Sequence, residues 1–156
     1  MPSPSQLLDL YRETSYDVRL PGGTRSSLRI GKPVPEFLRL WGRRDWPLLF
    51  ISACNPHSKQ LSADDNHDRT RTLLSRLDRS RLRRLVGVGR LANQAWRETS
   101  FLVAGLSLES ADRLAVEFGQ NAIVVAVNPL STRLRLYRNE WRTRIDNDAD
   151  IMWTGR

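Results

Sequence analysis

Residues 48–51 and residues 122–127 of this 156-residue chain are apolar at every position over the length of a β-strand. A strand with one face in solvent alternates apolar and polar side chains, whereas an unbroken apolar run is typical of a strand covered on both faces. The second run is rich in β-branched residues, which favour strands over helices. We therefore expect a sheet that holds both segments in its interior, as strands over residues 47–54 and 122–127.

Signals for a helix follow the first of these strands, and signals for a second helix precede the other strand. Ser62 with Asp65 forms a capping-box pattern that predicts a helix running to Asp78. Ser107 predicts the start of a second helix, and Gly119 its end. Two further strands are expected between these helices, over residues 83–88 and 99–105.

The resulting order over residues 47–127 is β-α-β-β-α-β, which is that of a split βαβ or ferredoxin-like sandwich. We predict an α+β fold with both helices on one face of the sheet. The length suits a single domain over residues 1–156, with an N-terminal extension (1–46), the core (47–127) and a C-terminal part (128–156).

The two ends of the chain carry their own signals. Ser5 is a candidate cap for a helix over residues 6–12, and a hairpin of residues 16–20 and 27–31 is expected around the Pro-Gly-Gly turn at 21–23. A short helix is expected over residues 35–41. We expect the N-terminal helix and hairpin to cover the second face of the sheet. Residues 134–137 and 141–145 are expected to form a closing hairpin.

The charge balance favours anionic partners. The chain has 25 Lys and Arg against 17 Asp and Glu, a formal charge of +8, and only two of the basic residues are Lys. Such a surplus attracts phosphate-bearing partners, and arginine also stacks on bases. Coding bias in a GC-rich genome is the competing explanation. Some arginines lie in basic clusters that are interleaved with aromatic residues, and we consider these arginines candidates for RNA or DNA binding. They are Arg43, Arg44, Arg81, Arg83, Arg84 and Arg142.

Other features limit the classes of function. Cys54 is the single cysteine, so no disulfide forms within the chain and a reducing compartment, the cytoplasm, is expected. No apolar run reaches the roughly 20 residues of a membrane helix. The acidic stretch 64–68 with His67 lacks the spacing of a known metal motif, and acids in a first helical turn complement the helix dipole. We expect no metal, no cofactor and no membrane partner, and protein partners stay open.

A small-ligand pocket is the alternative to polyanion binding. Asn55 and Ser58 follow the first buried strand, where such domains often place ligand contacts, and Pro56 is expected to hold Asn55 in extended geometry. Glu98 is a candidate pocket carboxylate, with Trp96 as a wall and Arg69 or Arg97 as its counter-charge. A structural turn and a structural ion pair are the competing explanations for these residues. Gln120 after the second helix is a further candidate for ligand contact.

Several of these residues fall in blocks that resemble a known family. The blocks are Thr14 with Tyr16, Ser52-Ala53-x-Asn55-Pro56-x-Ser58 with Leu61-Ser62, Asn66 and Arg69, then Trp96-x-Glu98-x-Ser100-Phe101-x-Val103-x-Gly105, and Phe118-Gly119-Gln120-x-Ala122. Over residues 10–127 the chain resembles the bacterial domain-of-unknown-function family 3293. The family supplies no activity. The resemblance implies a set of residues that act together: Asn55, Ser58, Asn66, Arg69, Trp96, Glu98 and Gln120.

Because the chain shows no nucleophile–base pair, we favour a non-catalytic binding module for an anionic partner such as nucleic acid. The alternative is a ligand pocket or an enzyme built around Asn55, Arg69 and Glu98. An adaptor that contacts a protein through the N-terminal hairpin is a third possibility.

Overall fold

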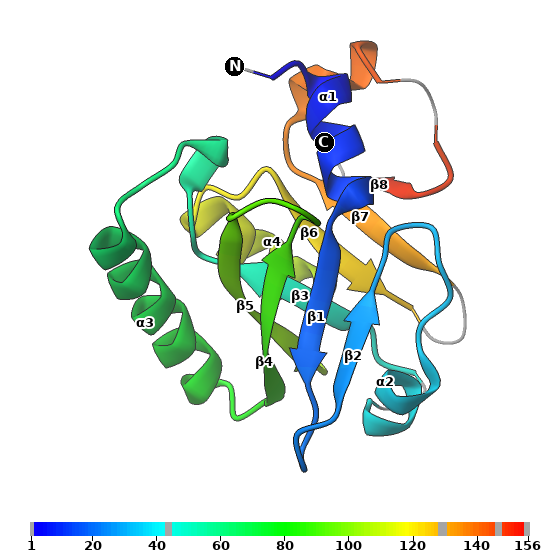
Figure 1. The fold of residues 1–156 in the computed structure, drawn as a ribbon, viewed down its shortest axis with the longest axis vertical. Helices are drawn as coiled ribbons and strands as arrows, with labels where there is room; N and C mark the ends of the chain where they lie inside the picture. Colours follow the sequence, from blue (N-terminus) through cyan, green and yellow to red (C-terminus); the bar gives the residue numbers. More distant parts are fainter. Residues whose placement is uncertain (1, 43–44, 128–130, 146–147, 155–156) are drawn as a thin grey trace.

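A computed structural model describes residues 2–42, 45–127, 131–145 and 148–154 as one α+β domain built on a single curled sheet (Figure 1). The strands are β1 (Ser15–Arg19), β2 (Arg25–Leu28), β3 (Leu48–Ser52), β4 (Arg83–Arg90), β5 (Arg97–Ala104), β6 (Ala122–Ala126), β7 (Thr132–Leu136) and β8 (Ile151–Trp153). The helices are α1 (Pro4–Glu13), α2 (Glu36–Trp41), α3 (Ala63–Arg79) and α4 (Leu108–Glu117), with 3₁₀ turns η1 (Pro56–Ser58) and η2 (Asn139–Thr143).

The eight strands lie in the order β2-β1-β4-β5-β3-β6-β7-β8. Every neighbouring pair is antiparallel except β7 and β8, which are parallel. β3 lies inside the sheet and is buried at all five positions, as its apolar sequence predicts.

Side chains on the two faces of the sheet form two separate cores. On one face, α3 and α4 place Leu73, Leu77, Ala111 and Ala115 against the strands. Side chains of α1, α2 and η2 pack on the other face, among them Leu8, Leu38 and Trp141. The expectation that both central helices share one face is confirmed, and so are their caps, since Ser62 accepts from the Asp65 amide and Ser107 from that of Ser110.

The terminal segments differ from expectation. The first helix is capped by Ser3, not Ser5, through a reciprocal capping box with Gln6. The β1–β2 hairpin extends the sheet edge beside β4 and does not cover the second face, where α1, α2 and η2 pack. The predicted C-terminal hairpin is wrong, because residues 139–143 form a 3₁₀ turn and β8 pairs in parallel with β7.

The four strands of the predicted core are neighbours in the order β4-β5-β3-β6 within this larger sheet. The α+β class is confirmed. A ferredoxin-like topology stays a prediction, since the sheet continues by two strands on each side of the four.

Candidate functional site

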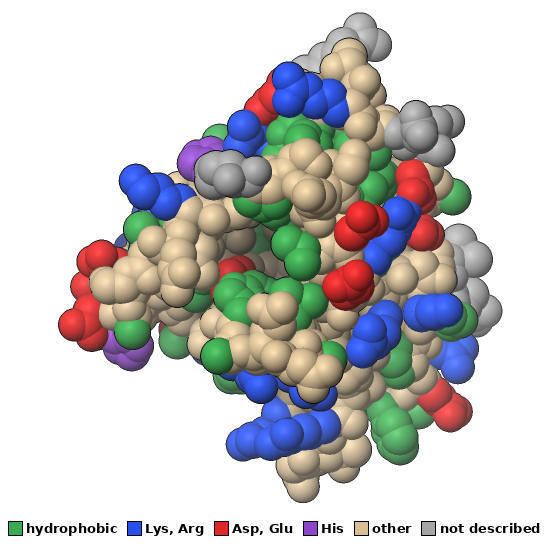
Figure 2. Space-filling view, turned by 45° about the horizontal axis from the view of Figure 1, so that its top comes forward, with side chains coloured by type: hydrophobic (Ala, Val, Ile, Leu, Met, Phe, Trp, Pro, Cys, Tyr) green, Lys and Arg blue, Asp and Glu red, His purple; other side chains and the backbone are tan. Residues whose placement is uncertain are grey.

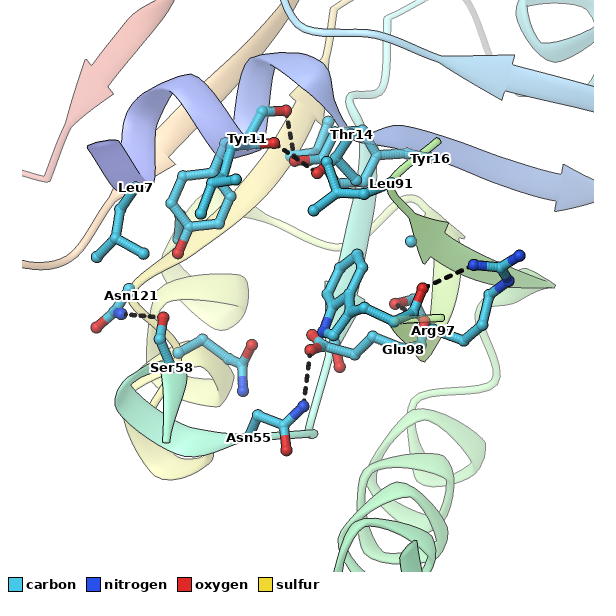
Figure 3. A pocket seen from close by; sticks show the side chains of 18 of the residues that line it. Leu7, Tyr11, Thr14, Tyr16, Asn55, Ser58, Leu91, Arg97, Glu98 and Asn121 are labelled. Atoms are coloured by element: carbon cyan, nitrogen blue, oxygen red, sulfur yellow. Dashed lines mark hydrogen bonds between the residues drawn. The ribbon is translucent and has the colours of Figure 1, made fainter. Parts of the chain in front are cut away.

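A pocket of about 780 Å³ lies between α1, the ends of β3 and β4, the start of β5 and the chain around residues 120–124 (Figure 3). It is seen as a hollow rimmed by apolar side chains in the space-filling view (Figure 2). Its volume falls within the range of about 300–1,000 Å³ that is typical of small-molecule sites. The pocket therefore has the size for an organic ligand.

Apolar and aromatic side chains form one side of the pocket. Leu7 and Tyr11 project from α1 (Figure 3), and Trp96, which directly precedes β5, also lines the pocket. Tyr16 packs edge-on against Phe50, with ring centroids 5.3 Å apart. The Tyr16 hydroxyl donates to the Tyr11 carbonyl at 3.0 Å, which fixes the end of α1 on the sheet.

The opposite side is a strained turn that follows β3. Asn55 (φ 49°), His57 (φ 53°) and Ser58 (φ 60°) all have left-handed backbone conformations that residues other than glycine rarely adopt. The expectation that Pro56 makes Asn55 extended is therefore wrong. Hydrogen bonds to other segments hold the turn, including one from the His57 amide to the Gly119 carbonyl at 2.6 Å.

The side-chain amide of Asn55 makes three hydrogen bonds. Its Oδ1 accepts from the Leu61 amide at 3.0 Å and from Asn66 Nδ2 at 2.8 Å, while Asn66 Oδ1 accepts from the Asn55 amide at 2.9 Å. These contacts orient the Asn55 amide group so that Nδ2 donates to Glu98 Oε2 at 3.2 Å (Figure 3). Asn55 thus links the strained turn to the pocket carboxyl.

Glu98 is partly buried and lines the pocket. Burial raises the pKa of this carboxyl, and hydrogen bonds with Ser52 and Asn55 offset the rise only in part. No ion pair of Glu98 occurs in the described part of the chain. Among the described residues, only hydrogen bonds therefore engage this carboxyl.

Neither expected counter-charge reaches Glu98. Arg69 Nε donates to the Ala53 carbonyl at 2.6 Å, and its Nη2 donates to the Phe118 carbonyl. Arg97 donates to the carbonyls of Gln94 and Trp96 instead (Figure 3). Both arginines therefore satisfy backbone carbonyls, and the pocket carboxyl has no cationic neighbour from them.

Gln120 and Asn121 tie the chain after α4 to the strained turn. Gln120 Nε2 donates to the Cys54 carbonyl at 2.9 Å, and Asn121 Nδ2 donates to Ser58 Oγ at 2.7 Å. Asn121 Oδ1 in turn accepts from Arg138 Nη1 at 3.2 Å. The turn is therefore supported from its far side as well as from α3.

Six of the seven residues suspected together meet at the pocket: Asn55, Ser58, Asn66, Trp96, Glu98 and Gln120. Arg69 does not line it and lies behind the turn. Sequence reasoning missed Tyr11 and Asn121. Tyr16 carried a signal in the N-terminal block of the family resemblance, whereas Tyr11 lies in the helix expected over residues 6–12 and carried no such signal.

The arginines near the start of β4 are spread among different contacts. Arg83 lies over the Trp41 ring, 4.9 Å from its centroid, and Arg84 pairs with Asp78 at 2.6 Å. Arg81 is exposed in the turn before the strand. This cluster carries one ion pair and one stacked guanidinium.

Arg142 in η2 stacks over Trp153 at 5.3 Å and donates to the Thr154 carbonyl, at the opposite end of the molecule from the start of β4 (Figure 1). Among the described residues, the arginine candidates therefore lie in two separate places. Arg43 and Arg44 fall outside the described residues. A nucleic-acid interface stays a prediction.

Comparison with known families identifies the segment that carries the polar side of the pocket. Residues 51–123 match the model of the family described as "Protein of unknown function (DUF3293)". The chain carries a DUF3293 domain. The resemblance noted in the sequence is thereby confirmed over residues 51–123, a segment that contains Asn55, Asn66, Glu98 and Gln120 but not Tyr11. No curated protein and no solved structure matches the chain.

Two further findings bear on the site. The described residues include no group of three or more His, Cys, Asp or Glu side chains placed to hold a metal ion. None of the helices in those residues combines the length and the apolar character needed to cross a membrane.

Proposed function

We propose that the pocket of the DUF3293 domain, carried on a ferredoxin-like core, binds a small organic molecule whose cationic nitrogen pairs with Glu98. The observation that supports this is a desolvated carboxyl that faces a pocket and has no ion-pair partner among the described residues.

The chemistry of the carboxyl favours a planar cation. A carboxylate offers about four lone-pair sites, and hydrogen bonds with Asn55 and Ser52 engage only part of this capacity. Guanidinium and amidinium groups match a carboxylate with two parallel N–H donors, and such charge-assisted bonds are about twice as strong as neutral ones. A ligand of this kind would supply the missing counter-charge.

The aromatic wall favours the same ligand. A cation that lies over the face of Trp or Tyr gains roughly 0.5–2 kcal/mol, the higher figure applying where water is excluded. Trp96, Tyr11 and Tyr16 line the pocket together with Glu98. A planar organic cation thus finds both a charge partner and stacking surfaces within one cavity.

Matched probes test this proposal by calorimetry. Benzamidine is a planar cation, and benzamide is its neutral counterpart of nearly the same shape. We expect benzamidine to bind the wild-type protein more tightly than benzamide does, and to bind Glu98→Gln about 10-fold more weakly, which corresponds to about 1.4 kcal/mol. The same titration should show tighter benzamidine binding as the pH rises through the raised pKa of Glu98, because only the ionised carboxyl pairs with the cation.

A second variant controls for the change of residue type. Glu109 lies on α4, is 82% exposed and pairs with Arg113 on the same helix. Glu109→Gln should leave benzamidine binding unchanged. Equal affinity of benzamidine for the wild type and for Glu98→Gln would refute the proposal.

A further inference from the structure

A second, smaller cavity of about 210 Å³ adjoins the pocket. Pro2, Leu7, Ser58 and Asn121 line both cavities, so the strained turn and the start of α1 form a common wall. The space is below the size of a typical whole-ligand site and suits one charged group. The remaining lining residues of the small cavity are Pro4, His57, Arg138, Trp141 and Arg144.

The small cavity is basic, in contrast to the main pocket. Arg138 is held in place by its bond to Asn121 and by the Trp141 ring, 5.4 Å from its guanidinium carbon. Arg144 is exposed and makes no ion pair among the described residues. Two guanidinium groups in one small cavity present the donor geometry that phosphate and carboxylate groups match.

Glu140 is the one acid of the described residues that pairs with Arg138. Its side chain is 60% exposed, and exposed ion pairs contribute only about 0–1 kcal/mol. A guanidinium has five N–H donors, and the bonds to Asn121 and Glu140 use only some of them. Arg138 therefore retains donors for an anion without breaking its other contacts.

Tyr11 connects the two cavities electrostatically. Burial raises the pKa of its hydroxyl, a hydrogen bond with Ser58 lowers it, the charge of Glu98 raises it and that of Arg138 lowers it. Opposite charges thus act on one side chain from the two cavities. His57 and Ser58 at the common wall also keep their strained backbone, a feature that clusters at ligand-binding segments.

We infer that the small cavity is an anion subsite of the same binding site, so that the ligand carries a phosphate or carboxylate group in addition to its cationic group. The cationic end of this ligand rests on the proposed function, whereas the subsite rests on Arg138, Arg144 and the shared wall.

Inorganic phosphate and acetate test the subsite directly by NMR on the ¹⁵N-labelled full chain. We expect at least one of the two to shift the backbone amides of His57, Ser58 and Asn121 in a saturable manner. The same anion should bind about 10-fold more weakly to Arg144→Gln, a variant chosen because Arg144 is exposed and its loss leaves the core intact. Amide shifts with phosphate but not with acetate identify a phosphate group on the ligand. Shifts with acetate but not with phosphate identify a carboxylate group.

Arg113→Gln is the matched control, because Arg113 is exposed on α4 and pairs only with Glu109 among the acids of the described residues. It should bind the anion as the wild type does. Shifts that are absent, that do not saturate, or that persist unchanged in Arg144→Gln would overturn the subsite.

A matched pair of cations tests whether one ligand spans both cavities. Arginine is agmatine with an added carboxylate, and we expect it to bind the wild type about 10-fold more tightly than agmatine by calorimetry. The gain should disappear in Arg144→Gln, while agmatine binding stays unchanged. Equal binding of the two compounds would overturn the shared site.

The cation pocket and the anion subsite can be refuted independently of each other. Anion binding that depends on Arg144, together with agmatine binding that is insensitive to Glu98→Gln, keeps the subsite and refutes the cation pocket. Agmatine binding through Glu98 with no anion-induced shifts refutes the subsite alone.

Discussion

Replacing Asn55 separates the two structural roles of this residue. Its side chain makes three hydrogen bonds, with the Leu61 amide, Asn66 Nδ2 and Glu98 Oε2. At about 1 kcal/mol net for each bond, their loss costs about 3 kcal/mol. Alanine also pays about 1 kcal/mol for the left-handed backbone, which asparagine tolerates better. We expect Asn55→Ala to lower the free energy of unfolding by about 4 kcal/mol.

Asn55→Gly removes the same three hydrogen bonds but adopts the left-handed backbone without a Cβ clash. We expect this variant to be more stable than Asn55→Ala by about 1 kcal/mol. Urea denaturation followed by tryptophan fluorescence and by circular dichroism measures both values, provided that the two probes give coincident transitions. If the two variants are equally stable, or if Asn55→Ala costs less than about 1.5 kcal/mol, the account of this turn is incorrect.

We expect changes in stability from substitutions at three further residues, Glu98, Asp112 and Leu102. Because burial raises the pKa of Glu98, its protonated form favours the folded state, and this contribution is lost as the pH rises through the raised pKa. Urea midpoints should therefore show Glu98→Gln more stable than the wild type at about pH 8 and equal to it at about pH 4. For Asp112, burial raises the pKa, but hydrogen bonds from Arg135 and Tyr137 outweigh it and lower the pKa overall. Asp112→Asn should cost roughly 1–2 kcal/mol in urea unfolding at neutral pH, and the difference should vanish as the pH falls through the lowered pKa; an undiminished difference in acid would contradict this. Leu102→Ala, at a fully buried position of β5, should cost about 2–5 kcal/mol in the same assay, and a loss below about 1 kcal/mol would show that the site is not close-packed.

Local sequence signals predicted the middle of the fold well. Caps at Ser62 and Ser107 determine where α3 and α4 begin, and these bonds form within one helical turn. The apolar sequence of β3 likewise indicated burial on both faces. Signals of this kind depend on neighbours in the sequence, so they are readable without a structure.

Long-range contacts explain why two predicted features were wrong, the C-terminal hairpin and the extended geometry of Asn55. The parallel pairing of β8 with β7 joins segments that a 3₁₀ turn separates. Nothing in the sequence of residues 141–145 indicated that these residues would lie outside the sheet. Pro56 predicts extended geometry for Asn55, but hydrogen bonds with Asn66 and Leu61 hold it in the left-handed region. Tertiary contacts overrode the local preference in both places.

The candidate site was predictable in most of its polar members and in Trp96, but not in Tyr11 or Asn121. Asn55 and Glu98 were suspected together, and the structure places them in contact. Arg69 or Arg97 was expected as the counter-charge of Glu98, yet the carbonyls of Ala53 and Phe118 take the donors of Arg69. The sequence does not show which carbonyls a turn leaves unpaired, so the loss of this counter-charge was invisible before the fold was known.

The pocket is assembled from parts of the chain that are synthesised at different times. Tyr11 leaves the ribosome before Asn55 and Glu98, while Leu134, which lines the same cavity, emerges after all three. A chain made beyond Glu98 but short of Leu134 therefore has the pocket carboxyl but lacks part of the surrounding wall. A ligand of this site would bind only the finished fold and would stabilise it by mass action, so that the cellular concentration of the ligand sets how much of the newly made protein survives proteolysis.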